Sequence, residues 1–240
     1  RAVLILDALS LREVPWLLES AAVHGFKVVG ARATGAELPA DTTPFAKALG
    51  YGQRSALENN GGSAGKLTGA VTESTVLPWR DCCGLVGAQR DIVFWHHWPD
   101  ARLHDLGVPG EGVERLSDEA GSVLAGDDFW GFVERLTQGR RLVITADHGY
   151  AASGLFPDVG EEAQSDYLKD RFKARRWMPG GESRFAWTPP LSLSLESRHG
   201  RHEYVVGRRK WKTAGGYPTL THGGLSLLEV LVPFIEIAKA

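Results

Sequence analysis

Three short apolar runs, each leading to an aspartate, constrain the fold of this chain most strongly. Residues 2–6 lead to Asp7, residues 92–95 to Asp100, and residues 142–146 to Asp147. Apolar runs of this length are typical of strands buried on both faces, as in a parallel sheet. In open α/β sheets, functional residues lie just beyond the carboxyl ends of the strands. The pattern therefore predicts an α/β fold with one functional cleft at an edge of its sheet.

The segments between these runs alternate between helix and strand patterns, which is typical of a parallel sheet. Helices are predicted at residues 11–24, 42–50, 129–136 and 226–230, and strands at residues 2–6, 26–30, 91–98, 141–147, 203–211 and 232–238. Ser10 is placed to cap the first helix, Gly25 to end it, and Pro44 suits the first turn of the second. A loop rich in glycine, asparagine and serine is predicted at residues 59–65.

The length and composition of the chain suit one domain. It has 240 residues, 43% of them hydrophobic, which is enough to bury a full core. No repeat, linker or low-complexity tract divides it, and it begins at Arg1 rather than at a methionine. We therefore expect residues 1–240 to form a single domain cut from a longer protein.

Membrane and redox features are also informative. No apolar stretch approaches the roughly 20 residues that span a bilayer, and no leader of signal-peptide type opens the chain. The only cysteines, Cys82 and Cys83, are adjacent, a spacing that strains a mutual disulfide and offers no metal knuckle. We expect a cytoplasmic protein without membrane association, in which both cysteines pack as small apolar residues.

Aspartate and histidine side chains recur where the predicted strands end, and they suit a site for two metal ions. The set is Asp7, Asp100, His104, Asp147, His148 and His222. Carboxylate oxygen and neutral imidazole nitrogen, without thiolates, favour Zn²⁺ or Mn²⁺ over a soft metal or a purely Mg²⁺ site. Asp100 and His104 are four residues apart, so one helical turn places them on the same face. Asp147 and His148 are adjacent, so we expect a turn at Gly149 to redirect them, which glycine permits.

Each of these residues also has a simpler interpretation when it is taken alone. A strand-end aspartate is often a turn former, His222 could be an ordinary loop histidine, and Asp100 with His104 could be an exposed helix pair. His96 and His97 are expected to pack inside their strand or to support the site. Asp41 and Asp105 are expected to face solvent or to support it.

Five motifs, in this order along the chain, resemble those of the alkaline phosphatase superfamily. They are Leu6-Asp7-Ala8-Leu9, Pro39-Ala40-Asp41-Thr42-Thr43-Pro44, Pro99-Asp100-Ala101-Arg102-Leu103-His104, Ala146-Asp147-His148-Gly149 and Thr221-His222-Gly223-Gly224. Within the superfamily the chain is most similar to PglZ domains, which occur in bacterial phage-defence systems and in some signalling proteins. The resemblance implies an alkaline-phosphatase-like three-layer sandwich, in which helices flank a mostly parallel central sheet.

The resemblance also implies roles for individual residues. Asp100, His104 and His222 would hold one ion, and Asp7, Asp147 and His148 the other. In the superfamily a threonine or serine attacks phosphorus and forms a covalent intermediate. In phosphodiesterase relatives this residue lies two positions before a proline, which selects Thr42. Thr43 is the alternative, although it fits an ordinary helix N-cap.

Cationic residues gather in one part of a chain whose net charge is only -2. Between Lys169 and Lys212 there are twelve Lys and Arg residues against four Asp and Glu, interleaved with aromatic residues. Cations can track a phosphate backbone while aromatic rings stack on bases. The substrate-binding candidates in this basic insert, at residues 150–221, are Arg176, Arg208, Arg209 and Lys210. A solvated helix face beside a charge-protected edge strand, or a surface for an acidic partner protein, is the alternative interpretation.

The sequence thus predicts a two-metal phosphoryl-transfer hydrolase. A phosphodiesterase or nuclease that cleaves nucleic acid or oligonucleotides through a covalent threonine intermediate is the favoured form. A phosphomonoesterase is one alternative. Another is a recognition or scaffold module of a defence complex, in which metals only stabilise the fold. Other subunits of such a complex are expected partners.

Overall fold

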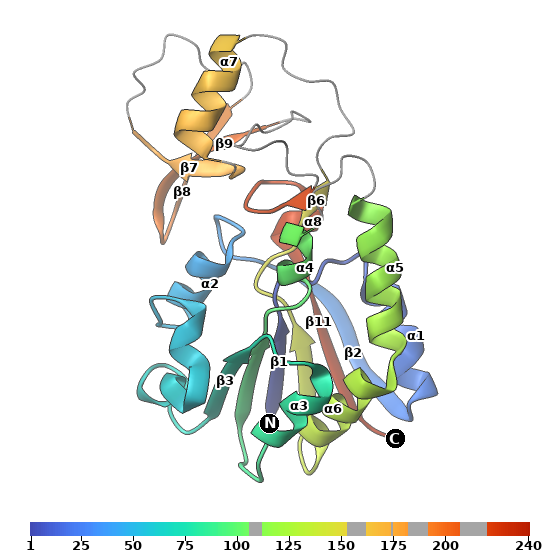
Figure 1. Ribbon diagram of the computed structural model, residues 1–240. Helices are drawn as coiled ribbons and strands as arrows, with labels where there is room; N and C mark the ends of the chain where they lie inside the picture. Colours follow the sequence, from blue (N-terminus) through green and yellow to red (C-terminus); the bar gives the residue numbers. More distant parts are fainter. Residues whose placement is uncertain (106–111, 153–161, 174, 182–191, 207–219) are drawn as a thin grey trace.

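The computed structural model describes residues 1–105, 112–152, 162–173, 175–181, 192–206 and 220–240. Figure 1 shows their arrangement. The strands are β1 (Ala2–Leu6), β2 (Phe26–Gly35), β3 (Val71–Thr75), β4 (Ile92–His96), β5 (Leu142–Thr145), β6 (Ala151–Ala152), β7 (Trp177–Pro179), β8 (Ser192–Ser197), β9 (Gly200–Val205), β10 (Leu220–Thr221) and β11 (Leu231–Lys239). The helices are α1 (Val14–Val23), α2 (Thr42–Ala48), η1 (Arg54–Ala64), α3 (Trp79–Cys82), η2 (Cys83–Leu85), α4 (Asp100–Asp105), α5 (Gly112–Ala125), α6 (Asp127–Thr137), α7 (Glu162–Tyr167), η3 (Leu168–Phe172) and α8 (Leu227–Val230).

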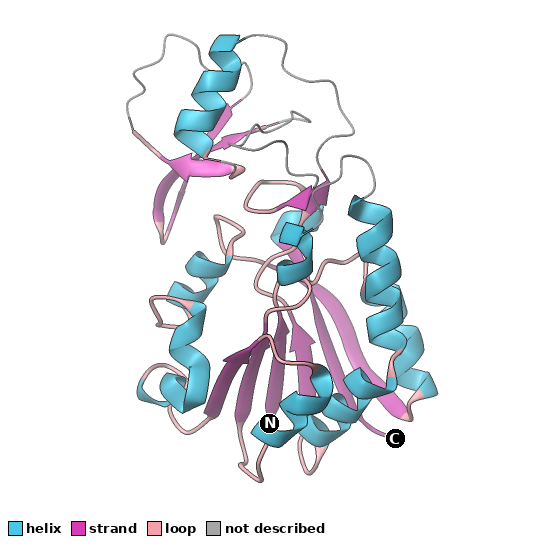
Figure 2. Ribbon diagram, in the orientation of Figure 1, coloured by secondary structure: helices cyan, strands magenta, loops and turns pink. Residues whose placement is uncertain are grey.

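A six-stranded sheet with the order β2-β11-β5-β1-β4-β3 forms the centre of the molecule (Figure 2). β1 pairs in parallel with β4 and β5, and β3 pairs in parallel with β4, whereas β11 is antiparallel to both β2 and β5. The carboxyl ends of β1, β4 and β5 therefore meet at one edge. Both termini lie at the opposite edge (Figure 1).

Side chains on the two faces of the sheet belong to two separate cores, because successive residues of a strand point to opposite faces. Leu4 and Leu6 of β1 pack with apolar residues of α1, α3, α5 and α6 on one face. Ile5, between them, packs with Trp95 and with residues of α2 and η1 on the other face. The result is a three-layer sandwich with a mostly parallel sheet, as expected.

The described part of the insert between β6 and β10 forms a smaller unit above the carboxyl edge of the central sheet (Figure 1). It contains a three-stranded antiparallel sheet with the order β7-β9-β8, together with α7 and the π-helical turn η3. Four buried side chains, Tyr167, Leu168, Phe172 and Met178, form its own small core.

Several predicted elements differ from the structure. The first helix begins at Val14 with Glu13, not Ser10, at its N-cap position. η1 occupies most of the predicted loop at residues 59–65, although its helical geometry is interrupted at Glu58, Asn59 and Asn60. The predicted strand at 203–211 corresponds to β9, and residues 207–211 lie outside the described part of the chain.

The packing of the two cysteines agrees with the expectation from the sequence. Cys82 is buried in the larger core with Cys83 packed against it, and both are free thiols. None of the helices in the described residues combines the length and the apolar character needed to cross a bilayer.

Candidate metal centre

The sheet brings the candidate residues together from distant parts of the chain. Asp7 directly follows β1, Asp100 begins α4 shortly after β4, and Asp147 and His148 follow β5. Thr42 begins α2 beyond the end of β2, and His222 follows β10. Since β11 is antiparallel, the loop before it returns His222 to the edge where the parallel strands end. All seven predicted catalytic and metal-binding residues, including His104 of α4, lie in this region.

Asp100, His104 and His222 form a first group of potential ligands. One nitrogen or oxygen atom from each lies within 4.8 Å of those of the other two. His104 Nε2 is 3.4 Å and His222 Nε2 is 3.6 Å from Asp100 Oδ1. This is the set implied for one ion.

Asp7, Asp100 and His148 form a second group, whose potential ligand atoms also lie within 4.8 Å of one another, and all three residues are buried. Asp147 is absent from this group, although it was expected with Asp7 and His148. Its Oδ2 nevertheless lies 3.4 Å from His148 Nε2, which is as close as His148 Nε2 is to Asp7 Oδ1. Its other oxygen, Oδ1, accepts a hydrogen bond of 3.0 Å from the backbone N–H of Ala8. Asp100 thus faces both groups, and Asp147 borders the second.

Unpaired polar atoms in this region fit divalent cations. Asp100 Oδ1, Asp147 Oδ2 and His222 Nδ1 are buried without a hydrogen-bond partner among the described residues. Buried polar atoms are normally hydrogen-bonded, so such a concentration needs an explanation. Carboxylate and imidazole ligands at this spacing suit Zn²⁺ or Mn²⁺, which would bind these atoms.

The pKa values of Asp147 and His148 also indicate that this region needs a bound positive charge. Burial raises the pKa of Asp147 to about 8, and the neighbouring Asp7 carboxylate adds to this shift. Burial opposes a charge on His148, but the carboxylates of Asp147 and Asp7 outweigh it and hold the pKa of His148 well above its ordinary value. Closely packed carboxylates therefore require compensating positive charge, which protons or a bound cation can supply.

The Thr42 hydroxyl lies directly beside the second group. Its Oγ1 is 3.2 Å from His148 Nε2 and donates a long hydrogen bond of 3.5 Å to Asp7 Oδ1. Thr43 is exposed. The helix begins at Thr42 with Asp41 at the N-cap position, so the expectation that Thr43 is the N-cap was wrong.

Asp7 is held by two residues that the sequence did not single out. Arg54 of η1 forms an ion pair with Asp7 Oδ2, and the buried Trp95 of β4 donates its indole N–H to the same oxygen at 3.1 Å. Arg54 is the only basic residue of the segment Arg54–Ala64, and a single basic residue only weakly indicates a role at the site. Nothing in the sequence links this arginine to Asp7, because 47 residues separate them.

Gly149 is required for a reason other than the expected one. The φ angle of Gly149 is not positive, so its backbone conformation does not require glycine. However, a Cβ atom at this position would lie 2.0 Å from the carbonyl oxygen of Leu228. Its N–H donates to the carbonyl of Glu229 at 3.0 Å. The glycine therefore permits close contact between the Asp147-His148 loop and α8.

The other histidines and acids are placed as follows. His96 ends β4, where its Nε2 lies 2.9 Å from the Leu77 carbonyl oxygen, and His97 Nε2 lies 3.0 Å from Ser74 Oγ. Asp41 Oδ2 accepts a hydrogen bond of 3.0 Å from Trp177 Nε1 and lies 3.8 Å from His222 Nδ1. Asp105 forms an exposed ion pair with Arg102.

The four substrate-binding candidates are placed differently. Arg208, Arg209 and Lys210 lie outside the described residues. Arg176 is buried, and its Nε lies 2.6 Å from Glu229 Oε1. A pocket of about 370 Å³ opens at the centre instead between Asp41, Thr42, Asp100, His104 and His222 on one side and Lys173 and Arg175 of the insert on the other.

A mostly parallel sheet between two helical layers matches the fold of alkaline-phosphatase-like proteins. No protein-family model matches the chain. Over 99 residues, or 40% of this chain, it is 28% identical to the alkaline phosphatase-like protein PglZ of Bacillus cereus (strain H3081.97). The chain spans only 12% of the length of that relative.

Solved structures with a similar fold cover nearly the whole chain. Phosphonoacetate hydrolase from Sinorhizobium meliloti 1021, in complex with phosphonoformate, has a TM-score of 0.55 and 13% identity, over 98% of this chain and 89% of its own. Murine ectonucleotide pyrophosphatase/phosphodiesterase 5 has a TM-score of 0.60 and 11% identity, over 98% and 87% of the two chains. At these identities the similarity establishes the fold, and the predicted fold class is confirmed.

Proposed function

We propose that this chain is a two-metal phosphoryl-transfer hydrolase, and specifically a phosphodiesterase that uses Thr42 as its nucleophile. The observation that carries the proposal is the position of the Thr42 hydroxyl. It lies within hydrogen-bonding reach of Asp7 and His148, beside a pocket that is also lined by the first ligand group. A threonine, two groups of ligands and an open pocket are the parts that this reaction needs.

The proposed site has a division of roles. Asp100, His104 and His222 would hold one ion, and Asp7, Asp147 and His148 the other, with Asp100 lying between the two groups. When bound, such ions lower the pKa of a nearby hydroxyl and stabilise the negative charge that develops on the leaving oxygen. Arg54 and Trp95 hold Asp7 in position through their contacts with its Oδ2.

The reaction proceeds in two displacements at phosphorus. In the first, Thr42 Oγ1 loses its proton to solvent and forms a bond to phosphorus, while the bond from phosphorus to the leaving alcohol breaks and that oxygen takes up a proton. In the second, water attacks the threonyl phosphodiester intermediate on the side opposite Oγ1 and gives up a proton to solvent, while the bond between phosphorus and Oγ1 breaks and Oγ1 takes up a proton. The free threonine is regenerated, and the product is a phosphate monoester.

Charge in the insert favours an anionic, polymeric substrate. The described basic residues Lys173 and Arg175 line the same pocket as Thr42, so part of the cationic segment faces the centre. We propose nucleic acid or oligonucleotides as the substrate class. We further propose a cytoplasmic role in phage defence, with other subunits of a defence complex as partners, because the ordered motifs of the chain resemble those of PglZ domains.

The test is hydrolysis of a chromogenic phosphate diester and the matching monoester. Protein stripped of metal with a chelator is reconstituted separately with Zn²⁺ and with Mn²⁺. Diester cleavage that returns with metal supports the proposal. Preference for the monoester would instead identify a phosphatase, and no hydrolysis with either ion would favour the scaffold alternative.

Substitution of the nucleophile separates catalysis from metal binding. Thr42→Ala is expected to reduce diester hydrolysis by at least about 1,000-fold, because the attacking oxygen is lost. The metal content should remain that of the unsubstituted protein. Thr43→Ala is the matched control, since the exposed Thr43 is next to it in the same helix, and it should retain activity within a few fold. Full metal-dependent activity in Thr42→Ala would refute the assignment.

A further inference from the structure

Two basic side chains of the insert close one side of the pocket at the candidate centre. Lys173 and Arg175 line it together with Thr42, Asp100 and His222. Both are exposed, unlike the neighbouring Arg176, which is buried. The insert therefore presents positive charge to the space in which a substrate would lie.

Lys173 and Arg175 have no close ionic partner among the described residues. Within the described segments, no carboxylate forms an ion pair with either of them. Asp41 lines the same pocket, but its Oδ2 already accepts a hydrogen bond from Trp177 and lies near His222. An anion entering the pocket would thus meet two cations available for binding.

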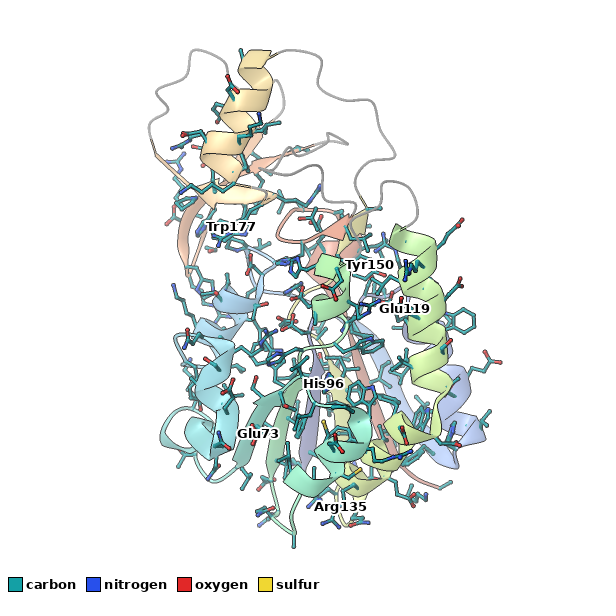
Figure 3. All side chains as sticks on the ribbon, viewed as in Figure 1. Glu73, His96, Glu119, Arg135, Tyr150 and Trp177 are labelled. Atoms are coloured by element: carbon teal, nitrogen blue, oxygen red, sulfur yellow. The ribbon has the colours of Figure 1, made fainter. Side chains whose placement is uncertain are left out.

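Neighbouring residues fix where these cations point. Arg176 forms an ion pair with Glu229. Trp177, which lies where the insert meets the core (Figure 3), donates its indole N–H to Asp41. Arg175 lines the pocket, and its guanidinium carbon is 5.2 Å from the centre of the Trp177 ring. That contact adds a cation–π interaction that restrains the Arg175 side chain.

Lys173 is held in an uncommon backbone conformation. It ends η3 in the left-handed region, with φ 45° and ψ 50°. Glycine is the usual residue at such a helix end, and a long side chain is disfavoured there. A lysine at this position therefore has a conformational energy cost, and a functional role of its ammonium group would explain why it is there.

We propose that Lys173 and Arg175 form an anion subsite that selects substrates with a second phosphate group beside the one that is cleaved. This inference rests on the proposed phosphodiesterase function. The two proposed metal ions would compensate the charge of one reacting phosphate, so two further cations in the same pocket match an additional anion. An oligonucleotide has such a phosphate on each neighbouring nucleotide, whereas a simple diester has none.

The test compares two substrates that differ only in this second phosphate. They are the para-nitrophenyl ester of thymidine 5′-phosphate and the same ester with a phosphate on the 3′ oxygen. The metal-reconstituted protein is expected to show a kcat/KM about tenfold higher for the 3′-phosphorylated ester. Lys173→Gly, which keeps the left-handed backbone but removes the charge, and Arg175→Ala should each reduce this preference to about twofold or less.

Two variants serve as matched controls. Lys173→Arg retains the charge and should retain the preference. Lys169→Ala removes an exposed cation of the same π-helical turn that does not line the pocket, and should leave the preference unchanged. Equal kcat/KM for the two esters in the unsubstituted protein, or an undiminished preference in Lys173→Gly and Arg175→Ala, would overturn the subsite.

A binding measurement separates this inference from the proposed function. Calorimetry on metal-loaded Thr42→Ala compares thymidine 3′,5′-bisphosphate with thymidine 5′-monophosphate. Tighter binding of the bisphosphate supports the subsite if the added Lys173→Gly substitution abolishes it. This conclusion holds even if neither ester is hydrolysed, because the absence of hydrolysis would count only against the phosphodiesterase function. Equal affinities would overturn the subsite even if both esters are hydrolysed.

Discussion

Asp100 is the residue on which the candidate centre depends most. It belongs to both ligand groups, and its Oδ1 is buried without a hydrogen-bond partner among the described residues. Burial alone would raise its pKa, but the His104 imidazole, 3.4 Å from Oδ1, and the charges of His222 and His148 outweigh this and lower it. The carboxylate is thus kept ionised between imidazoles, as a metal ligand must be.

Asp100→Ala is therefore expected to weaken binding at both groups, whereas His104→Ala should affect the first group only. The affinity lost at each site should be at least about 100-fold, since changes to groups that merely support ligands already cost 10- to 100-fold. Metal content after dialysis, measured by mass spectrometry, checks this. Asp105→Ala is the control, because Asp105 is exposed and pairs with Arg102. An Asp100→Ala protein that retains two ions would contradict the shared position.

The sequence identified the candidate residues but not all of their relations. The order of the motifs placed Asp7, Asp100 and Asp147 at strand ends, and the parallel sheet accounts for their convergence. Asp147 directs one oxygen to the N–H of Ala8, a residue with a positive φ of 64°. Asp100 faces both ligand groups. Such backbone details carry no sequence pattern. The metal-ligand roles remain predictions.

At the scale of elements, the loop after β5 is positioned by its contact with α8. Gly149 donates its N–H to Glu229, and the carboxylate of Glu229 accepts hydrogen bonds from the N–H groups of Gly224 and Ser226. One short helix therefore fixes the loop with Asp147 and His148 and the loop that follows His222. The close approach at Gly149 leaves no room for a side chain.

Gly149→Ala is expected to lower the free energy of unfolding by about 3 kcal/mol, because the added methyl would overlap the Leu228 carbonyl and the backbone would have to shift. Gly131→Ala is the matched control. Gly131 lies in α6 with no atom within 4 Å of an added Cβ, so alanine should stabilise the protein by about 0.5–1 kcal/mol. Urea denaturation measures both. Equal free energies of unfolding for the two variants would show that the backbone at Gly149 accommodates a methyl group without loss of stability.

The mostly apolar strands were predicted well, whereas β3 and α5 were missed. β1, β4, β5 and β11 are mostly apolar and were all expected. β3 was missed because its sequence, Val-Thr-Glu-Ser-Thr, buries Thr72 and Ser74, and the Thr72 hydroxyl is satisfied by the Leu57 carbonyl of η1. α5 was also missed, although its buried residues Leu116, Ala120 and Leu124 recur at helical spacing.

At the scale of the whole molecule, the insert is attached to the core through charged and polar contacts of very different burial. Arg176 and Glu229 are almost completely buried at the centre. After β8, the exposed Arg198 pairs with Glu37, and His199, which is only 9% exposed, lies 3.0 Å from the same carboxylate. The sequence predicted a basic insert near the site, but it could not show which cations would be used for attachment and which would remain available in the pocket.

Arg176→Met is expected to lower the free energy of unfolding by about 3 kcal/mol, because it leaves the Glu229 carboxylate buried without its cation. The remaining N–H donors to Glu229 keep the loss near the lower end of the range for buried pairs. Arg198→Met is the matched control: its side chain is 62% exposed, so the pair with Glu37 should contribute less than about 1 kcal/mol. Urea denaturation of both variants, read from tryptophan fluorescence, measures the difference. A similar small loss in both would mean that the buried pair does not hold the insert against the core, and that the pocket wall formed by Lys173 and Arg175 is supported by other contacts.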